Sequence, residues 1–198
     1  MKKLFSLFLC CAIVLTFASC GEKNKNNTSK IDLEYYAKTG IMPEAEFNLG
    51  SDAEDVISKL SKQKEDFDKG QTEETNDDHS ETAFIFEVTE GEKNVLIDNG
   101  VINYYYNKDN KQNGISYIVN YDTAFGIEIG TLISEVQNKL SDYDLKSETA
   151  TENDVFFAPY IMDGSVLKLR IKNVEFMFVF QENELVATAM YDTENWKN

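Results

Sequence analysis

The amino-acid sequence predicts an α+β fold made of two tandem repeats, each consisting of one helix followed by a four-stranded antiparallel sheet. Three observations lead to this prediction. A segment that begins at Phe47 recurs 80 residues later, at Ile127. Each copy is followed by a polar stretch, and then by short runs of β-branched and aromatic residues separated by turn residues. The repeats, at 45–123 and 124–198, together offer about 150 residues, enough for a substantial core.

The two helix segments align without a gap. Phe47–Leu60 reads FNLGSDAEDVISKL, and Ile127–Leu140 reads IEIGTLISEVQNKL. Glycine, serine or threonine, an acidic residue, valine, lysine and leucine recur in register. We expect Ser51 and Thr131 to cap the helices, and the valine and leucine, four residues apart, to share one helical face. Each copy therefore predicts a short amphipathic helix.

Strand-like runs follow each helix after a polar loop, expected at 61–81 and 141–153. The dipeptide Asn99-Gly100 is typical of a tight hairpin turn. The run at 174–180 is apolar on both sides, which predicts a strand buried on both faces inside the sheet. The predicted strands are 82–89, 93–97, 101–107 and 114–122 in the first repeat, and 154–160, 165–171, 174–180 and 184–192 in the second.

The N-terminal segment has the pattern of an export signal. Two lysines precede an apolar run of about 14 residues, 4–17, which has signal-peptide length and is too short to span a bilayer. The sequence FASCG at 17–21 resembles the bacterial lipobox. This resemblance implies a signal peptide at 1–19 and a diacylglyceryl group on Cys20, which would anchor the chain to the cell membrane on its extracytoplasmic side. A buried N-terminal helix and a secretory peptide cut elsewhere are the alternatives.

Residues 20–44 are predicted to form the lipidated cysteine and a flexible tether. The stretch 21–30 (GEKNKNNTSK) has no large apolar residue and cannot bury enough surface to fold. A flexible chain reaches roughly 5–6 Å times the square root of its residue number, so the folded part stays within a few nanometres of the membrane. Tyr35 and Tyr36 could pack on that folded part, and Pro43 marks a break.

Composition excludes several classes of function. The cysteines, Cys10, Cys11 and Cys20, all lie in or at the end of the signal segment, so the mature chain has no thiol for disulfides or metal. Removal of 1–19 takes two of the 19 basic residues and none of the 35 acidic ones, which leaves 17 against 35 and a net charge of −18. Such a chain is not expected to bind nucleic acid or anionic lipid by itself; electrostatics favours a basic partner, or simply solubility.

The sequence offers no clear catalytic or metal site. Its only histidine, His79, lies in a polar loop with Asp77, Asp78 and Glu81. These side chains could hold a divalent ion, but the loop lacks the glycine and the alternating ligands of an EF-hand, and a solvated loop is the simpler interpretation. Paired carboxylates are too common among 35 acids to indicate a glycosidase. We therefore expect no enzyme activity, cofactor, catalytic residue or metal ligand.

Two aromatic clusters are the candidates for partner binding, at 104–106 (YYY) and 156–160 (FFAPY). Neighbours in a strand point to opposite faces, so Tyr105 faces away from the tyrosines beside it. Aromatic side chains give a large contact area at a low entropic cost. A second layer of structure that covers the rings is the alternative. The predicted contact residues are Tyr104, Tyr106, Phe157 and Tyr160.

The tandem arrangement at about 45–193 resembles the β-lactamase-inhibitor-protein type, in which a helical segment packs on a four-stranded antiparallel sheet. The helix start, Gly-Ser/Thr followed by an acidic residue, valine and leucine, is similar to that of the small outer-membrane-assembly lipoproteins. These resemblances imply a fold rather than an activity. No partner-binding residue of either family is matched here, and inhibition of a β-lactamase is not implied.

These observations together predict an extracytoplasmic lipoprotein that acts as a binding or interaction module. Its partner is expected to be a protein or peptide, bound through the concave face of the joined sheets. A structural or assembly accessory of a cell-envelope complex is the alternative, and a hydrolase that uses loop carboxylates is the least favoured class.

Overall fold

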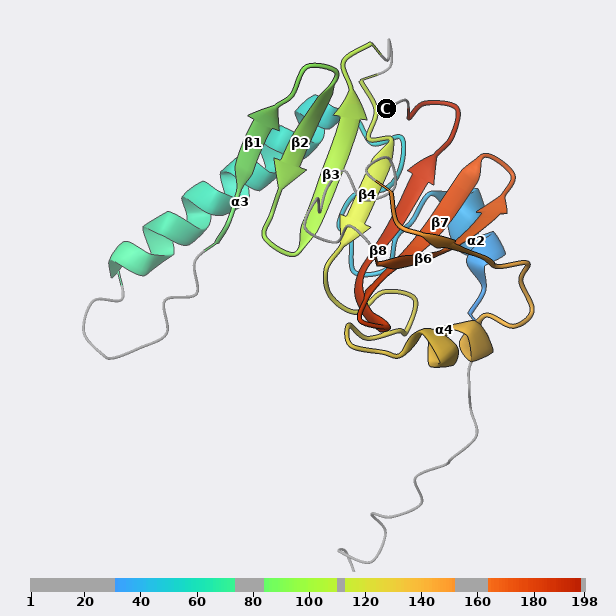
Figure 1. Ribbon diagram of the computed structural model, residues 1–198. Coiled ribbons are helices and arrows are strands. Elements are labelled where there is room, and N and C mark those ends of the chain that lie inside the picture. Colours follow the sequence, from blue (N-terminus) through green and yellow to red (C-terminus); the bar gives the residue numbers. More distant parts are fainter. Residues whose placement is uncertain (1–30, 74–83, 110–112, 152–163, 197–198) are drawn as a thin grey trace, which may run out of the picture. The chain divides into compact units, whose positions relative to one another are not determined.

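The computed structural model describes residues 31–73, 84–109, 113–151 and 164–196 (Figure 1). In these ranges the chain forms three helices and one eight-stranded antiparallel sheet, which confirms the predicted α+β class. The helices are α2 (Leu33–Thr39), α3 (Ala53–Glu73) and α4 (Ile133–Lys139). The strands are β1 (Glu87–Glu90), β2 (Asn94–Asp98), β3 (Ile102–Asn107), β4 (Tyr117–Asn120), β5 (Lys146–Thr149), β6 (Ser165–Ile171), β7 (Val174–Gln181) and β8 (Glu184–Asp192).

The strand order is β1-β2-β3-β4-β8-β7-β6-β5, so the strands before α4 and those after it join in one sheet. The join is made by β4 and β8, where Tyr117 lies opposite Tyr191 and Asn120 opposite Thr188. The edge strands β1 and β5 have four residues each, all exposed, and short charged edges resist further pairing. We call α3 with β1–β4 the first half, and α4 with β5–β8 the second half.

All three helices contribute to the core on one face of the sheet, which we call the helix face. Val56 and Leu60 of α3 and Val136 and Leu140 of α4 are buried in one cluster with strand residues such as Phe176. The four-residue spacing of valine and leucine therefore does place both side chains on the buried face of each helix. Figure 1 shows α3 lying behind β1, β2 and β3.

Helix α3 begins at a different cap from the one predicted. Asp52 Oδ1 accepts hydrogen bonds from the backbone N–H groups of Glu54 (2.9 Å) and Asp55 (3.1 Å). Ser51 Oγ instead accepts one from Asn48 N at 3.1 Å, in the turn before the helix. The prediction for Ser51 was wrong because an aspartate one residue later is an equally good cap and lies closer to the first helical N–H groups.

Helix α3 is also longer than predicted, since residues 61–73 are helical and not part of a polar loop. Lysine, glutamine and glutamate favour helix, and Lys64 pairs with Asp68 four residues on, at 3.3 Å. Phe67 packs near Phe84 at a centroid distance of 6.0 Å, which gives the extension a tertiary contact. None of the helices that the structure describes is long and apolar enough to cross a membrane.

Helix α4 starts without a side-chain cap. Leu132 occupies the N-cap position and makes no capping hydrogen bond. The Thr131 hydroxyl, predicted to be the cap, donates to the Glu128 carbonyl at 2.6 Å and so belongs to the preceding turn. The prediction for Thr131 was wrong because the helix begins one residue later than its sequence suggests, at a leucine that cannot cap.

The first strand of the second half is also displaced. Strand β5 lies at Lys146–Thr149, inside the predicted loop at 141–153, and the predicted strand at 154–160 falls outside the described residues. The polar sequence of β5 forms a strand because β5 pairs with β6, with Ser147 opposite Leu167. Strand β7 is buried along both faces and lies between β6 and β8, as its apolar run predicts.

The segment before α3 is fixed by three backbone hydrogen bonds to the residues just before β4. Gly50 N donates to Ile115 O (2.7 Å), Ile115 N donates to Ser51 O (2.8 Å), and Ala53 N donates to Asn113 O (2.9 Å). Gly50 has φ +85°, a conformation that glycine adopts without strain. The helix start is therefore fixed by the sheet as well as by its own cap.

The segment before α4 is fixed by three bonds of the same kind. Gly130 N donates to Leu185 O (2.8 Å), Leu185 N donates to Thr131 O (2.9 Å), and Ile133 N donates to Asn183 O (3.0 Å). Gly130 also has φ +85°. Asn183 and Leu185 lie 70 residues after Asn113 and Ile115, their counterparts in the first half. The two glycines lie 80 residues apart.

The folded unit begins at Ile31, so much of the predicted tether segment is part of it. Leu33 and Met42 have no exposed surface. The Tyr143 hydroxyl donates to Ile31 O (2.8 Å) and accepts from Leu33 N (3.0 Å), which fixes the start of α2. Tyr36 packs against Phe125 at 5.1 Å, as expected for a lead-in that contacts the core.

Candidate binding surface

The face of the sheet opposite the helices, which we call the second face, has an apolar cluster of its own. Directly paired residues of neighbouring strands share a face, so the register assigns each side chain to one side of the sheet. Both faces of β4 are buried, so the strand contributes to the core on the helix face and to the cluster on the second face. The buried members of the second cluster are Tyr105, Tyr117, Val119, Ala150, Val166, Met177, Val179, Ala187, Ala189 and Trp196.

Four aromatic residues of this cluster, which we call the aromatic row, lie side by side across the centre of the sheet. Tyr105 is opposite Tyr117, and Tyr117 is opposite Tyr191. The rings of Tyr117 and Tyr191 are stacked, with centroids 4.9 Å apart and an interplanar angle of 9°. Trp196, from the chain end, packs 4.9 Å from Tyr117 and 6.0 Å from Tyr105. Three of the four are buried, and Tyr191 is half-buried, so Tyr191 brings the row to the surface.

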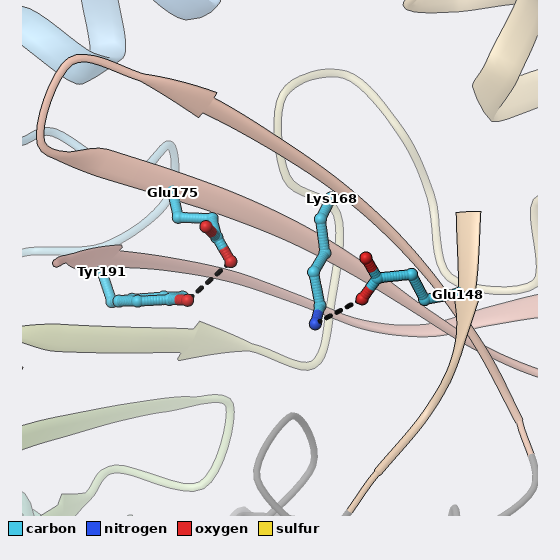
Figure 2. Close-up of polar contacts among 4 residues, drawn as sticks. All are labelled: Glu148, Lys168, Glu175 and Tyr191. Atoms are coloured by element: carbon cyan, nitrogen blue, oxygen red, sulfur yellow. Dashed lines mark hydrogen bonds and ion pairs between the residues drawn. The ribbon is translucent and has the colours of Figure 1, made fainter. Parts of the chain in front are cut away.

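Polar contacts continue the row towards the edge of the second half (Figure 2). The Tyr191 hydroxyl donates to Glu175 Oε1 at 2.6 Å, and the two residues lie directly opposite each other on β8 and β7. On the next strands outward, Lys168 Nζ lies 3.0 Å from Glu148 Oε2. The Lys168 side chain is 16% exposed, so this pair is better shielded from water than an ordinary surface pair.

This geometry holds the half-buried tyrosine in one orientation. Its ring is clamped by the stack on Tyr117, and its hydroxyl is clamped by Glu175. A side chain already held in its binding conformation loses little rotamer freedom when a partner arrives. Tyr191 and Glu175 together therefore offer an apolar ring edge beside a carboxylate, a combination suited to contact with a polypeptide that carries apolar groups and hydrogen-bond donors.

The predicted contact residues at 104–106 are mostly inside the protein. Tyr104 has no exposed surface, its ring packs against Phe47 at 5.5 Å, and its hydroxyl accepts a hydrogen bond from Glu46 N at 3.2 Å. Tyr106 is half-buried and packs against the core of the helix face. Tyr105 points to the second face, as the alternation predicts, and is also buried there. For Tyr104 and Tyr105 the alternative interpretation is therefore correct, because other parts of the protein cover both rings.

Burial has a large effect on the acidity of these phenols. It raises the pKa of Tyr104 to about 12, against the lowering effect of backbone hydrogen bonds from Phe47 and Glu46. Burial likewise raises the pKa of Tyr105 to about 12, against a hydrogen bond from Asn103. Burial raises the pKa of Tyr106 as well, and the charge of Glu90 adds to it. These hydroxyls therefore stay protonated at neutral pH and are unsuited to act as bases.

The other predicted functional residues lie outside the part of the chain that the structure describes. These are the predicted lipidation site Cys20, the contact residues Phe157 and Tyr160, and the polar loop of His79. Within the described ranges, no group of three or more histidine, cysteine, aspartate or glutamate side chains is arranged to hold a metal ion.

The sequence analysis missed Tyr191, at the surface end of the aromatic row, and the polar residues Glu175 and Lys168 that continue from it. Tyr117 and Val119 alternate within the predicted strand at 114–122, and both lie on the face that carries the row. The missing information was the strand register across the join of β4 and β8, because Tyr117 and Tyr191 are 74 residues apart in the sequence. The shared Tyr-Asp-Thr tripeptide at 121–123 and 191–193 was the available signal.

Comparison of the chain with protein families, with characterised proteins and with solved structures finds no match. The resemblances to the β-lactamase-inhibitor-protein type and to the small outer-membrane-assembly lipoproteins therefore stay predictions from the sequence. The candidate surface rests on the geometry of the aromatic row and of the polar contacts beside it.

Proposed function

We propose that this chain is an extracytoplasmic lipoprotein, anchored to the membrane through Cys20, whose folded part is a binding module for a protein or peptide. The observation that carries the binding role is Tyr191, half-buried and held by both its ring and its hydroxyl. Aromatic residues fixed in this way are typical anchors of protein interfaces. The anchoring role is supported by the apolar run at 4–17 and the sequence FASCG at 17–21.

We further propose that the sheet consists of two tandem copies of a helix with four strands. The support is the pair of matching hydrogen-bond sets before α3 and α4, each around a glycine with φ +85°. Both sets come from the segments that align in sequence. The strand order, symmetric about the join of β4 and β8, agrees with two copies related by a rotation. One continuous sheet from two copies gives a wide second face on which a partner could bind.

The tether sets the position of this module. From Cys20 to the start of the folded unit at Ile31 there are about 11 residues, which span roughly 20 Å as a flexible chain. The binding surface therefore stays close to the membrane, and a partner in the same membrane is met at a raised effective concentration.

Replacement of Cys20 tests the anchor. The variant Cys20→Ala lacks the thiol that would receive the diacylglyceryl group, so the protein is expected to leave the membrane fraction. The measurement is metabolic labelling with a radioactive fatty acid, together with fractionation of the cells. Lipid label on the Cys20→Ala protein would rule out this anchor.

A crosslinking experiment on intact cells tests the binding role. A photoreactive phenylalanine analogue is placed at Tyr191 or, as the control, at Glu65 on the exposed side of α3. A recurrent adduct from position 191 that is absent from position 65 is expected, and mass spectrometry identifies it. Absence of such an adduct, or the same adducts at both positions, would contradict the proposal. An adduct found within a stable complex purified from membranes would favour the alternative, an assembly accessory.

A further inference from the structure

The start of α4 exposes apolar side chains at its surface. Ile129 is 38% exposed and Leu132 is 45% exposed. Val186, half-buried, is the extra residue of a β-bulge between β7 and β8, where Val179 pairs with Ala187 and Phe180 with Leu185. We call Ile129, Leu132 and Val186 the α4 patch. It adjoins a pocket of about 370 Å³ lined by Ile129, Gly130, Gln181, Glu182, Glu184, Leu185 and Val186.

The corresponding positions before α3 are polar or covered. Asp52 stands where the second half has Leu132, and it caps its helix. Ser116 stands where the second half has Val186, and it is 1% exposed. Leu49 stands where the second half has Ile129. The two frames share the three hydrogen bonds around the glycine, so these positions can be compared directly.

Leu49 is covered by the segment that follows α2. Leu49 N donates to Gly40 O at 2.9 Å, and a Cβ added to Gly40 would lie 3.3 Å from the Leu49 Cβ. An extended piece of chain thus lies directly on this residue. Among the residues that the structure describes, no carbonyl accepts a hydrogen bond from Ile129 N as Gly40 O does from Leu49 N. Within the described residues, the backbone N–H of Ile129 therefore lacks the partner that Leu49 N has, and Ile129 and Leu132 are exposed beside it.

The pocket beside the patch is acidic. Glu182 and Glu184 line it, and none of the described residues that line it is a lysine or an arginine. Glu128 and Glu135, both exposed, flank the patch along the chain. A cation near this rim is attracted by several carboxylates, while the apolar centre rejects a purely polar ligand.

We propose that the α4 patch binds an extended segment of a protein partner that carries an apolar side chain next to lysine or arginine. A backbone carbonyl of the segment accepts from Ile129 N, as Gly40 O does from Leu49 N. The apolar side chain packs on Leu132 and Val186, and the cation faces Glu182 and Glu184. This inference shares with the proposed function only the class of partner, since its residues are separate from the aromatic row.

The test is a binding titration with short fluorescent peptides and the full chain in detergent. The probe alternates lysine and leucine; the comparison peptides alternate glutamate with leucine and lysine with serine. The lysine–leucine peptide is expected to bind most tightly, and Leu132→Asp is expected to weaken its binding about tenfold or more. Because the added aspartate attracts a basic peptide, a loss of affinity in this variant identifies the apolar contact.

Four further measurements complete the design. Glu184→Gln is expected to weaken binding of the lysine–leucine peptide and to reduce its dependence on salt. Ser58→Ala, on the exposed side of α3, is expected to leave the affinity unchanged. Tyr191→Ala measures separately whether the aromatic row takes part in binding the peptide, so failure of the aromatic row and failure of the patch give different results. Sedimentation of the wild type checks that no second copy occupies the patch. Unchanged binding by Leu132→Asp, equal binding of the glutamate–leucine peptide, or a dimer that Leu132→Asp dissolves would overturn the inference.

Discussion

The starts of α3 and α4 have the same backbone frame and opposite surfaces. Each has a glycine at φ +85° and three hydrogen bonds to the sheet, yet Asp52 caps α3 whereas Leu132 leaves α4 uncapped and is 45% exposed. An uncapped helix end with an exposed leucine costs stability and solubility. The backbone frame therefore specifies the fold, and the side chain at the cap position is available for another use.

The largest effect is expected from the core leucines that the two halves share. Leu60 and Leu140 are both buried in the same cluster, so each change to alanine should lower the free energy of unfolding by about 2–5 kcal/mol. Because β4 and β8 join the halves in one sheet, each variant should unfold in a single transition. Urea unfolding followed by circular dichroism is the measurement, and two separate transitions would show that the halves are independent.

The third strands of the two halves differ in their aromatic residues, and this difference should affect stability at high pH. Strand β3 carries Tyr104 and Tyr105, each with a pKa raised to about 12, whereas β7 carries phenylalanines. Above pH 10 the unfolded phenols ionise before the folded ones, so the unfolded state binds fewer protons and stability falls between pH 10 and pH 12. A shift of about two units corresponds to roughly 3 kcal/mol for each tyrosine, all of it present below pH 10.

Urea unfolding from pH 9 to pH 12 measures this loss. The variant Tyr104→Phe should flatten the decline, because it removes one of the phenols whose pKa is raised by burial. Tyr35→Phe is the matched control, since Tyr35 is 51% exposed and its removal should leave the slope unchanged. An equal slope in the wild type and in Tyr104→Phe would contradict the assignment of the loss to buried phenols.

Much of the fold could be predicted because it depends on local patterns. The period of Val56 and Leu60 indicates a helix with one buried face, and the apolar run at 174–180 indicates an inner strand. The errors lie where tertiary contacts outweigh local composition. Residues 61–73 are polar yet helical, and β5 is polar yet paired with β6. Pairing with β6 stabilises β5, and the contact of Phe67 with Phe84 adds to the helix propensity of 61–73.

The candidate surfaces were harder to predict, since each combines residues distant in sequence. Tyr117 and Tyr191 stack only because β4 pairs with β8, and hydrophobic periodicity carries no information about which strands become neighbours. Leu132 stands four residues before Val136, at the spacing of the buried helix face. It nevertheless occupies the N-cap position and is 45% exposed, which the spacing alone does not indicate.

The smallest expected effect is the exchange of caps, and it tests the comparison most directly. Leu132→Asp should raise the free energy of unfolding by about 0.5–1 kcal/mol, because the new carboxylate can accept from the first N–H groups of α4 as Asp52 does in α3. Asp52→Leu should lower it by about 1 kcal/mol.

Thermal and urea unfolding of both variants are the measurements, and Asp55→Leu, which keeps the backbone N–H that donates to Asp52, controls for an exposed leucine at α3. If Leu132→Asp stabilises the protein, the natural leucine lowers the stability of the fold, as is expected of a residue that contacts a partner. If instead Leu132→Asp is neutral or destabilising, the frame before α4 does not accept a cap, and the equivalence of the two helix starts ends at their backbone hydrogen bonds.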